Sequence, residues 1–412
     1  DDQSGQEMLK VTRLSAKFDI MPFFKGKISI SSVQLFGFNI NLRKETPDSP
    51  PNFKFVLDAF ASKDTVKKEN SLDLRINSIL IRRGRMSYHV LSEEETPGKF
   101  NAKHIQLQNI IANISLKALS KDSLNLGIKR LSLDEKASGF SLKKMSLKLV
   151  ANNKQTNIDN FTIELPETSL KLDTIHLEYD SLKAFDRFTE QVHFSFRTLP
   201  SQVTLKDISP FVPILSHFKE PVTLDMEVKG TVDQLTCSHL EITADDRQFR
   251  LRGDVSLQDL SRPQDAYVYG TLSELSANTR GVGFLVRNLS PNYNGVPPLL
   301  ERLGNVSFQG EISGYFTDLV TYGQLQTSLG NVKTDLKLSS DKTKGLFAYS
   351  GAVKTEDFQL GKLLDNEELG EITFNLDVHG RHIADHLPAV ELKGLIASID
   401  YSRYRYENIT LD

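Results

Sequence analysis

The densest set of side chains that could bind a metal ion is a histidine-rich segment near the end of the chain, HGRHIADH. It contains His379, His382 and His386 together with Asp385. Zinc accepts imidazole and carboxylate ligands, but the i, i+3, i+7 spacing gathers three histidines on one face only in a helix. Because Gly380 ends a strand-like run, the segment is predicted to be a polar turn. The sequence therefore predicts no metal site and no cofactor.

The motifs that usually carry catalysis or nucleotide binding are missing from the sequence. It has no G-x-S-x-G, G-x-x-x-x-G-K-[ST], G-x-G-x-x-G or H-E-x-x-H pattern. Acidic clusters such as Asp245-Asp246 and Glu93-Glu94-Glu95 lie in polar, turn-like segments, where solvated loop charge is the expected role. No catalytic residue is predicted, and the chain is expected not to be an enzyme.

The bulk composition indicates a nearly neutral chain with a modest apolar content. The formal net charge is −3 over 412 residues, so no basic field points to nucleic acid as a partner. Hydrophobic residues make up 39%, below the usual ~45–50%, which fits an elongated shape with few buried layers. Cys237 is the only cysteine and is predicted to be a buried structural thiol. No apolar window approaches the ~18 residues of a spanning helix.

Short runs with an apolar residue at every second position dominate the chain, for example over 145–149, 161–165, 222–228 and 372–378. Such alternation forms strands that are apolar on one face and polar on the other. Parallel strands buried on both faces would read instead as continuous Val/Ile/Leu runs. The predicted fold is therefore mostly β, an elongated and curled antiparallel sheet shaped like a groove, with a few short amphipathic helices.

The segment FKGKISISSVQLFGFNINLRKE shows how such a sheet could bend. Its alternation shifts phase at Ser31-Ser32 and again at Gly37. Phase shifts of this kind are typical of β-bulges, which bend a strand.

Helical patterns are few. Residues 52–63 form the longest, with Phe53, Val56, Leu57 and Phe60 on one face, and shorter helices are predicted near Phe211, Leu299 and Leu360. The short helices precede related segments: VTLDMEVKGTVDQL starts at Val222, VSFQGEISGYFTDL starts 84 residues later (306 − 222), and ITFNLDVHG follows at an offset of 150 (372 − 222). The glycine near the end of each copy is predicted to need a positive φ.

These patterns divide the chain into three predicted regions. They are residues 1–100, residues 101–205, and residues 206–412 with repeat copies near 208–290, 291–356 and 357–412.

Two parts of the chain resemble the AsmA and TamB family of bacterial envelope proteins, in particular TamB of the Bacteroides type. The step PFFKGKISI over 22–30 and the strand VQLFGFNINL over 33–42 resemble the membrane-proximal region of that family. The segments FQLGKLLDNEELGEITFNLDVHG and YRYENITLD are similar to TamB repeats. The resemblance covers the first ~45 residues and roughly 205–412, and its motifs are weak patterns rather than catalytic signatures.

The resemblance implies a periplasmic protein of outer-membrane biogenesis with a curled β-sheet that is apolar inside. It also implies an inner-membrane anchor before Asp1 and a further region beyond Asp412 that reaches an outer-membrane assembly protein. Both ends of the chain read as cuts in a longer protein, since it starts on DDQSGQEMLK and stops on a strand-like NITLD.

A lipid conduit also follows from the residues themselves, because a single sheet has an apolar face that acyl chains could cover. An assembly scaffold that offers sheet edges to outer-membrane proteins is the alternative, and an enzyme on a β-solenoid would require a carboxylate cluster on one strand face. The predicted lipid-contacting residues are Ile28, Ile30, Ile40, Leu42, Val222, Leu224, Val306, Phe308, Ile372, Phe374 and Leu376.

Overall fold

Strands make up most of the chain, as the alternation predicts. The computed structural model describes residues 1–19, 28–60, 74–119, 123–244, 248–262, 264–289, 295–341, 346–383 and 389–412. Within these ranges lie 22 strands and a few short helices, which confirms the predicted fold class. Among the helices so described, none combines the length and the apolar content needed to cross a membrane.

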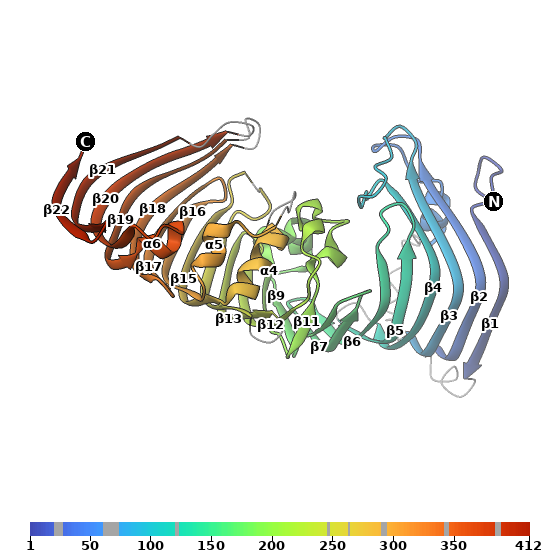
Figure 1. The fold of residues 1–412 in the computed structure, drawn as a ribbon. Coiled ribbons are helices and arrows are strands. Elements are labelled where there is room, and N and C mark those ends of the chain that lie inside the picture. The colour runs from blue at the N-terminus through green and yellow to red at the C-terminus, as the bar shows by residue number, and fades with distance from the viewer. Residues whose placement is uncertain are drawn as a thin grey trace. The chain divides into compact units, whose positions relative to one another are not determined.

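The chain forms two compact units, shown in Figure 1. Unit 1 comprises residues 1–183 and 196–219, and unit 2 comprises residues 184–195 and 220–412. The predicted regions 1–100 and 101–205 thus fall mostly within unit 1. The element η1 (Leu182–Arg187) and the strand β10 (His193–Arg197) each contain a boundary between the units.

Unit 1 is a sheet whose long strands follow one another in chain order. Each of the strands β1 to β7 pairs with the next, and every pair is antiparallel except β2 with β3, which is parallel. A parallel pair needs a crossover connection, and the helix α2 (Lys54–Phe60) lies in it. This helix confirms the core of the one predicted over 52–63, whose last residues lie outside the described ranges.

The elements of unit 1 are β1 (Leu9–Asp19), β2 (Ile28–Lys44), α2, β3 (Leu74–Val90), β4 (His104–Leu119), β5 (Ser123–Glu135), β6 (Ser141–Asn152), β7 (Gln155–Glu164), β8 (Ser169–Lys171), β9 (Ile175–Glu178), β11 (Ser201–Val203), η2 (Leu205–Ile208) and η3 (Pro213–His217).

The phase shift predicted at Ser31-Ser32 is confirmed as a bulge, whereas Gly37 is an irregular position at which the register with β1 does not shift. The pairs Phe18–Ile30 and Lys17–Ser32 leave Ser31 as an extra residue on β2. Gly37 has a φ of +63°, and the Thr12 hydroxyl donates a hydrogen bond of 2.9 Å to its carbonyl oxygen. The extra residue at Ser31 is a bulge of the kind that bends a strand, and Gly37 departs from strand geometry through its positive φ alone.

Unit 2 is an antiparallel sheet in which each strand from β12 to β22 pairs with the next along the chain. Helical segments interrupt it after β15 and after β19. Figure 1 shows these helices along one end of the strands, and α5 contacts both α4 and α6. The three predicted repeat copies coincide with strands β12, β16 and β20, which contain their first residues Val222, Val306 and Ile372.

The elements of unit 2 are α3 (Phe188–Gln191), β12 (Val222–Thr231), β13 (Gln234–Ala244), β14 (Phe249–Gln258), β15 (Tyr267–Ala277), α4 (Thr279–Leu289), α5 (Pro298–Arg302), β16 (Val306–Tyr315), β17 (Asp318–Thr327), β18 (Gly330–Asp341), β19 (Leu346–Gln359), α6 (Leu360–Leu364), β20 (Leu369–Ile383), β21 (Ala389–Tyr401) and β22 (Tyr404–Leu411).

The short helices predicted near Phe211, Leu299 and Leu360 are confirmed as η3, α5 and α6. The helix α4 was not predicted, because the glycines in TRGVGFLVRNL lower helix propensity. Gly281 is nevertheless required, since a Cβ there would lie 1.8 Å from the carbonyl oxygen of Gln248. This close approach lets α4 lie directly on Gln248, the residue before β14.

Glu135, at the end of β5, is the most buried carboxylate of unit 1 in the described ranges, with 3% of the residue exposed. It accepts hydrogen bonds from the backbone N–H groups of Gln106 (2.9 Å), Ala137 (3.2 Å) and Ser138 (2.7 Å). Burial acts to raise the pKa of Glu135, but these hydrogen bonds outweigh it and the net pKa is lowered.

Replacing this carboxylate should destabilise unit 1. In Glu135→Gln an amide NH2 group faces backbone donors, and we expect a loss of about 1–3 kcal/mol in the free energy of unfolding at pH 7. Because the folded pKa is lowered, the contribution is present above the unfolded pKa of about 4.3 and is lost as the pH falls through the folded pKa. Urea unfolding at pH 7 and pH 4 should therefore separate the variant from the native chain most clearly at pH 7.

The matched control is Glu164→Gln, which removes a half-exposed ion pair with Lys144 (3.3 Å). Such pairs contribute about 0–1 kcal/mol. Equal stability of the two variants at pH 7 would contradict the role given to Glu135.

Candidate functional site

One face of the unit 2 sheet is apolar across all of its strands. Antiparallel register places Leu224 opposite Ile242, and Phe308 opposite Leu275. The same face continues through Leu325 and Val332. The opposite face of these strands carries mainly charged and polar residues. The alternation in the sequence therefore becomes a single apolar surface on one side of the sheet.

The helix α4 covers one end of this face. The Phe284 ring stacks on the Phe249 ring with 5.5 Å between centroids and 28° between planes. Both side chains are 6% exposed and form a buried cluster with Val282. Val222 and Val306, two predicted lipid-contacting residues, pack against this cluster.

The helix α6 covers the face at the later strands. Ile372 is 6% exposed and belongs to a buried cluster with Leu329 and Phe358, against which Leu360 and Phe374 pack. Leu376 is also 6% exposed. Of three more predicted lipid-contacting residues, Ile372 and Leu376 are thus buried, and Phe374 is partly buried.

The apolar face continues beyond both helix-covered clusters as a strip of partly exposed side chains, which we call the open apolar strip. Register joins its members from strand to strand: Leu257 with Val268, Leu319 with Leu338, and Val378 with Leu392. Leu392 is 43% exposed, and the other members are intermediate between buried and exposed. The strip consists of Val255, Leu257, Val268, Ile312, Leu319, Leu336, Leu338, Val378 and Leu392.

Glycines alternate with the large side chains of the strip. Gly270 pairs with Ile312, Gly314 with Leu319, and Gly351 with Leu336. A side chain at Gly351, which has a φ of +141°, would place its Cβ 2.0 Å from the carbonyl oxygen of Asp335. Because these positions have no side chain, the backbone forms the floor between the apolar ridges.

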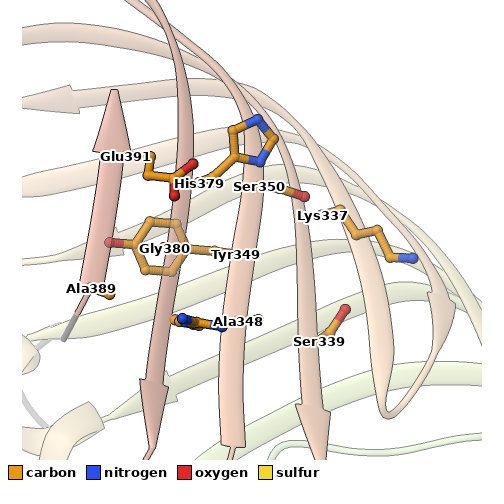
Figure 2. Close-up of a pocket in the computed structure, with 10 residues that line it drawn as sticks. Lys337, Ser339, Ala348, Tyr349, Ser350, His379, Gly380, Ala389 and Glu391 are labelled. Carbon is orange, nitrogen blue, oxygen red and sulfur yellow. The ribbon is translucent and has the colours of Figure 1, made fainter. Parts of the chain in front are cut away.

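Aromatic rings occupy the space where other glycines of the sheet lack a side chain. A Cβ added at Gly323 would lie 2.6 Å from Phe308 Cζ, and one added at Gly380 would lie 2.1 Å from Tyr349 Cζ. Figure 2 shows the Tyr349 ring beside Gly380.

The positive φ predicted for the repeat glycines is confirmed at Gly230 and Gly314. The prediction of a positive φ is wrong at Gly380. Glycine is needed there because the Tyr349 ring occupies the space that a side chain would fill.

A hollow of about 360 Å3 lies over the strands β18 to β21 (Figure 2). His379, Arg381 and Glu391 are among its lining residues, together with Lys337. Lys337 Nζ lies 3.1 Å from Asp318 Oδ2, and the hydrogen bond from the Ser339 hydroxyl, followed by this ammonium group, lowers the pKa of Asp318. The hollow therefore lies on the polar face of the sheet and is lined by side chains of both charges.

The structure corrects the prediction of a polar turn at HGRHIADH. Strand β20 extends to Ile383, so His379 lies in a strand. His386 and Asp385 lie outside the described residues, as does the side chain of His382.

The predicted burial of Cys237 is confirmed: it is 7% exposed, and burial raises the pKa of its thiol to about 11.

Unit 1 has an apolar face of its own. Ile30 pairs with Ile76, Ile114 with Ile128, and Leu126 with Leu149. Most of these side chains are partly exposed, as are Ile40 and Leu42. Ile28 begins β2. At one point the face is closed by Phe38, which is 6% exposed and occupies the space that a side chain at Gly84 would need.

Comparison of the chain with family models, with curated proteins and with solved structures found no significant match.

Loss of the Phe284 ring should destabilise unit 2. Phe284→Ala removes a buried aromatic side chain that joins α4 to the sheet, and we expect a loss of about 3–5 kcal/mol in the free energy of unfolding. Phe316→Ala, at a position that is 49% exposed, should change it by less than about 0.5 kcal/mol. Chemical unfolding would measure both values, and similar effects would show that α4 does not seal this end of the face.

Proposed function

We propose that the chain is a non-enzymatic protein that binds the acyl chains of phospholipid along its open apolar strip. The observation that carries the proposal is that, within the described residues, the helices bury the apolar face at one end of the strands, while the same face continues past them. In the setting that the sequence resemblance implies, the chain would conduct phospholipid through the periplasm toward the outer membrane.

The composition of the strip favours a hydrocarbon ligand. Its ridges are leucine, isoleucine and valine, and its floor contains glycine backbone already engaged in strand pairing. Each CH2 group removed from water contributes about 0.8 kcal/mol, so an acyl chain gains affinity along its length. The repeated ridges also provide equivalent positions, which suits a ligand that slides.

The two helix-covered clusters suggest why the ligand would occupy the strip and not the whole face. Val306 and Ile372 already contact protein side chains in clusters with α4 and α6. A lipid could reach them only by displacing protein side chains that already pack there. We therefore place the acyl chain over Leu319, Leu336 and their neighbours.

Two adjacent residues of β17 offer a matched test, since they point to opposite faces. Leu319 belongs to the strip, whereas Val320 lies on the polar face and is 40% exposed. Leu319→Asp places a carboxylate where an acyl chain would cover it, which is strongly unfavourable. Val320→Asp adds the same charge to a surface in contact with water.

The measurement is mass spectrometry of lipids extracted from protein purified without detergent from Gram-negative cells. Phospholipid should co-purify with the native chain and with Val320→Asp, and should fall at least several-fold in Leu319→Asp. Circular dichroism would establish that both variants remain folded. Absence of phospholipid from the native chain, or equal amounts in both variants, would favour the alternative of an assembly scaffold for outer-membrane proteins.

A further inference from the structure

Strand pairing in unit 1 brings together two histidines that are 15 residues apart in the chain. His89, near the end of β3, pairs directly with His104, the first residue of β4. Their Nδ1 atoms are 3.1 Å apart. Glu95 lies in the connection between the two strands, and the ligand atoms of all three side chains lie within 4.8 Å of one another.

A hydrogen bond at Nε2 of His104 indicates which tautomer its imidazole ring adopts. His104 Nε2 lies 2.9 Å from the backbone carbonyl oxygen of Glu93. A carbonyl oxygen only accepts, so this bond places a proton on Nε2, and in the neutral ring Nδ1 then carries a lone pair. That lone pair faces His89. Metal-binding histidines commonly use such a bond to a backbone carbonyl to orient the ring.

The spacing of the nitrogen atoms suits one shared metal ion. Two imidazole nitrogens at about 2.0–2.1 Å from a tetrahedral zinc ion are about 3.3 Å apart. The observed 3.1 Å is close to that value. His104 is 6% exposed, His89 is partly exposed and Glu95 is exposed, so the third ligand is at the solvent side.

Hydrogen bonds fix the connection between β3 and β4 on both sides of Glu95. Val90 N–H donates to the carbonyl oxygen of Lys103 (2.9 Å), and Gly98 N–H donates to that of Ala137 (2.9 Å). The Asn101 side-chain amide donates to the carbonyl oxygen of Glu94 (3.1 Å). Because these bonds already order the segment, metal binding would cost little conformational entropy.

We propose that His89 Nδ1, His104 Nδ1 and the Glu95 carboxylate bind a divalent transition-metal ion, with Zn2+ the best match. A mixed set of imidazole and carboxylate ligands suits Zn2+, whereas Ca2+ and Mg2+ prefer oxygen ligands alone. The fourth position is left for water or another ligand. Such an ion would join β3, β4 and their connection at one point of unit 1.

The test is a Zn2+ titration of the tag-free, EDTA-treated chain by calorimetry, with Co2+ absorption as a second readout. One equivalent of Zn2+ should bind, and Co2+ should give the visible absorption of a tetrahedral site. His89→Gln and Glu95→Gln should each weaken Zn2+ binding at least tenfold. Both positions are more exposed than His104, which makes them the safer substitutions for folding.

His239→Gln is the matched control, because His239 is an exposed histidine of β13 in unit 2. It should leave Zn2+ affinity unchanged. Failure of the native chain to bind Zn2+, or unchanged affinity in both His89→Gln and Glu95→Gln, would show that the pair is a histidine hydrogen bond only. Either outcome would leave the lipid proposal unaffected, since the open apolar strip lies in unit 2.

Discussion

The structure depends on one constraint, which is that a strand with period-two alternation places its apolar side chains on one face. In a sheet that is one layer thick, that face must be covered by something other than the sheet. In unit 2, α4 covers it through the Phe284–Phe249 stack, and α6 covers it around Ile372. The remainder of the face, the open apolar strip, is where the proposed ligand would lie.

Some strands contain an extra residue, and at that point a bulge shifts the alternation by one position. The apolar side chains therefore stay on the same face along the whole strand. In β13, His239 has a φ of +53°, and the register with β14 shifts between Cys237 and Leu240. The apolar series therefore changes from odd positions (Leu235, Cys237) to even positions (Leu240, Ile242) while staying on one face. Ser31 does the same for β2 in unit 1. A phase shift in the sequence is thus part of the pattern and not a break in it.

Local sequence patterns were enough to predict the fold class, the short helices at α5 and α6, and the irregularities at Ser31 and Gly37. They failed where the outcome depends on contacts between distant residues. The helix α4 was missed because Gly281 is needed for packing against Gln248, not for helix formation. The side chains that helices cover could not be separated from those of the open apolar strip, since both share one alternation. His89 and His104 meet only through the register of β3 with β4.

The most direct measurement of acyl-chain contact uses the absence of native tryptophan from the chain. Single tryptophans would be placed at the adjacent positions in Leu319→Trp and Val320→Trp, and the purified proteins loaded with phospholipid that carries bromine on its acyl chains. Bromine quenches fluorescence only at close range, so lipid in the open apolar strip should quench the tryptophan at 319 and spare the one at 320. No quenching at 319, or equal quenching at both positions, would contradict the lipid-binding account.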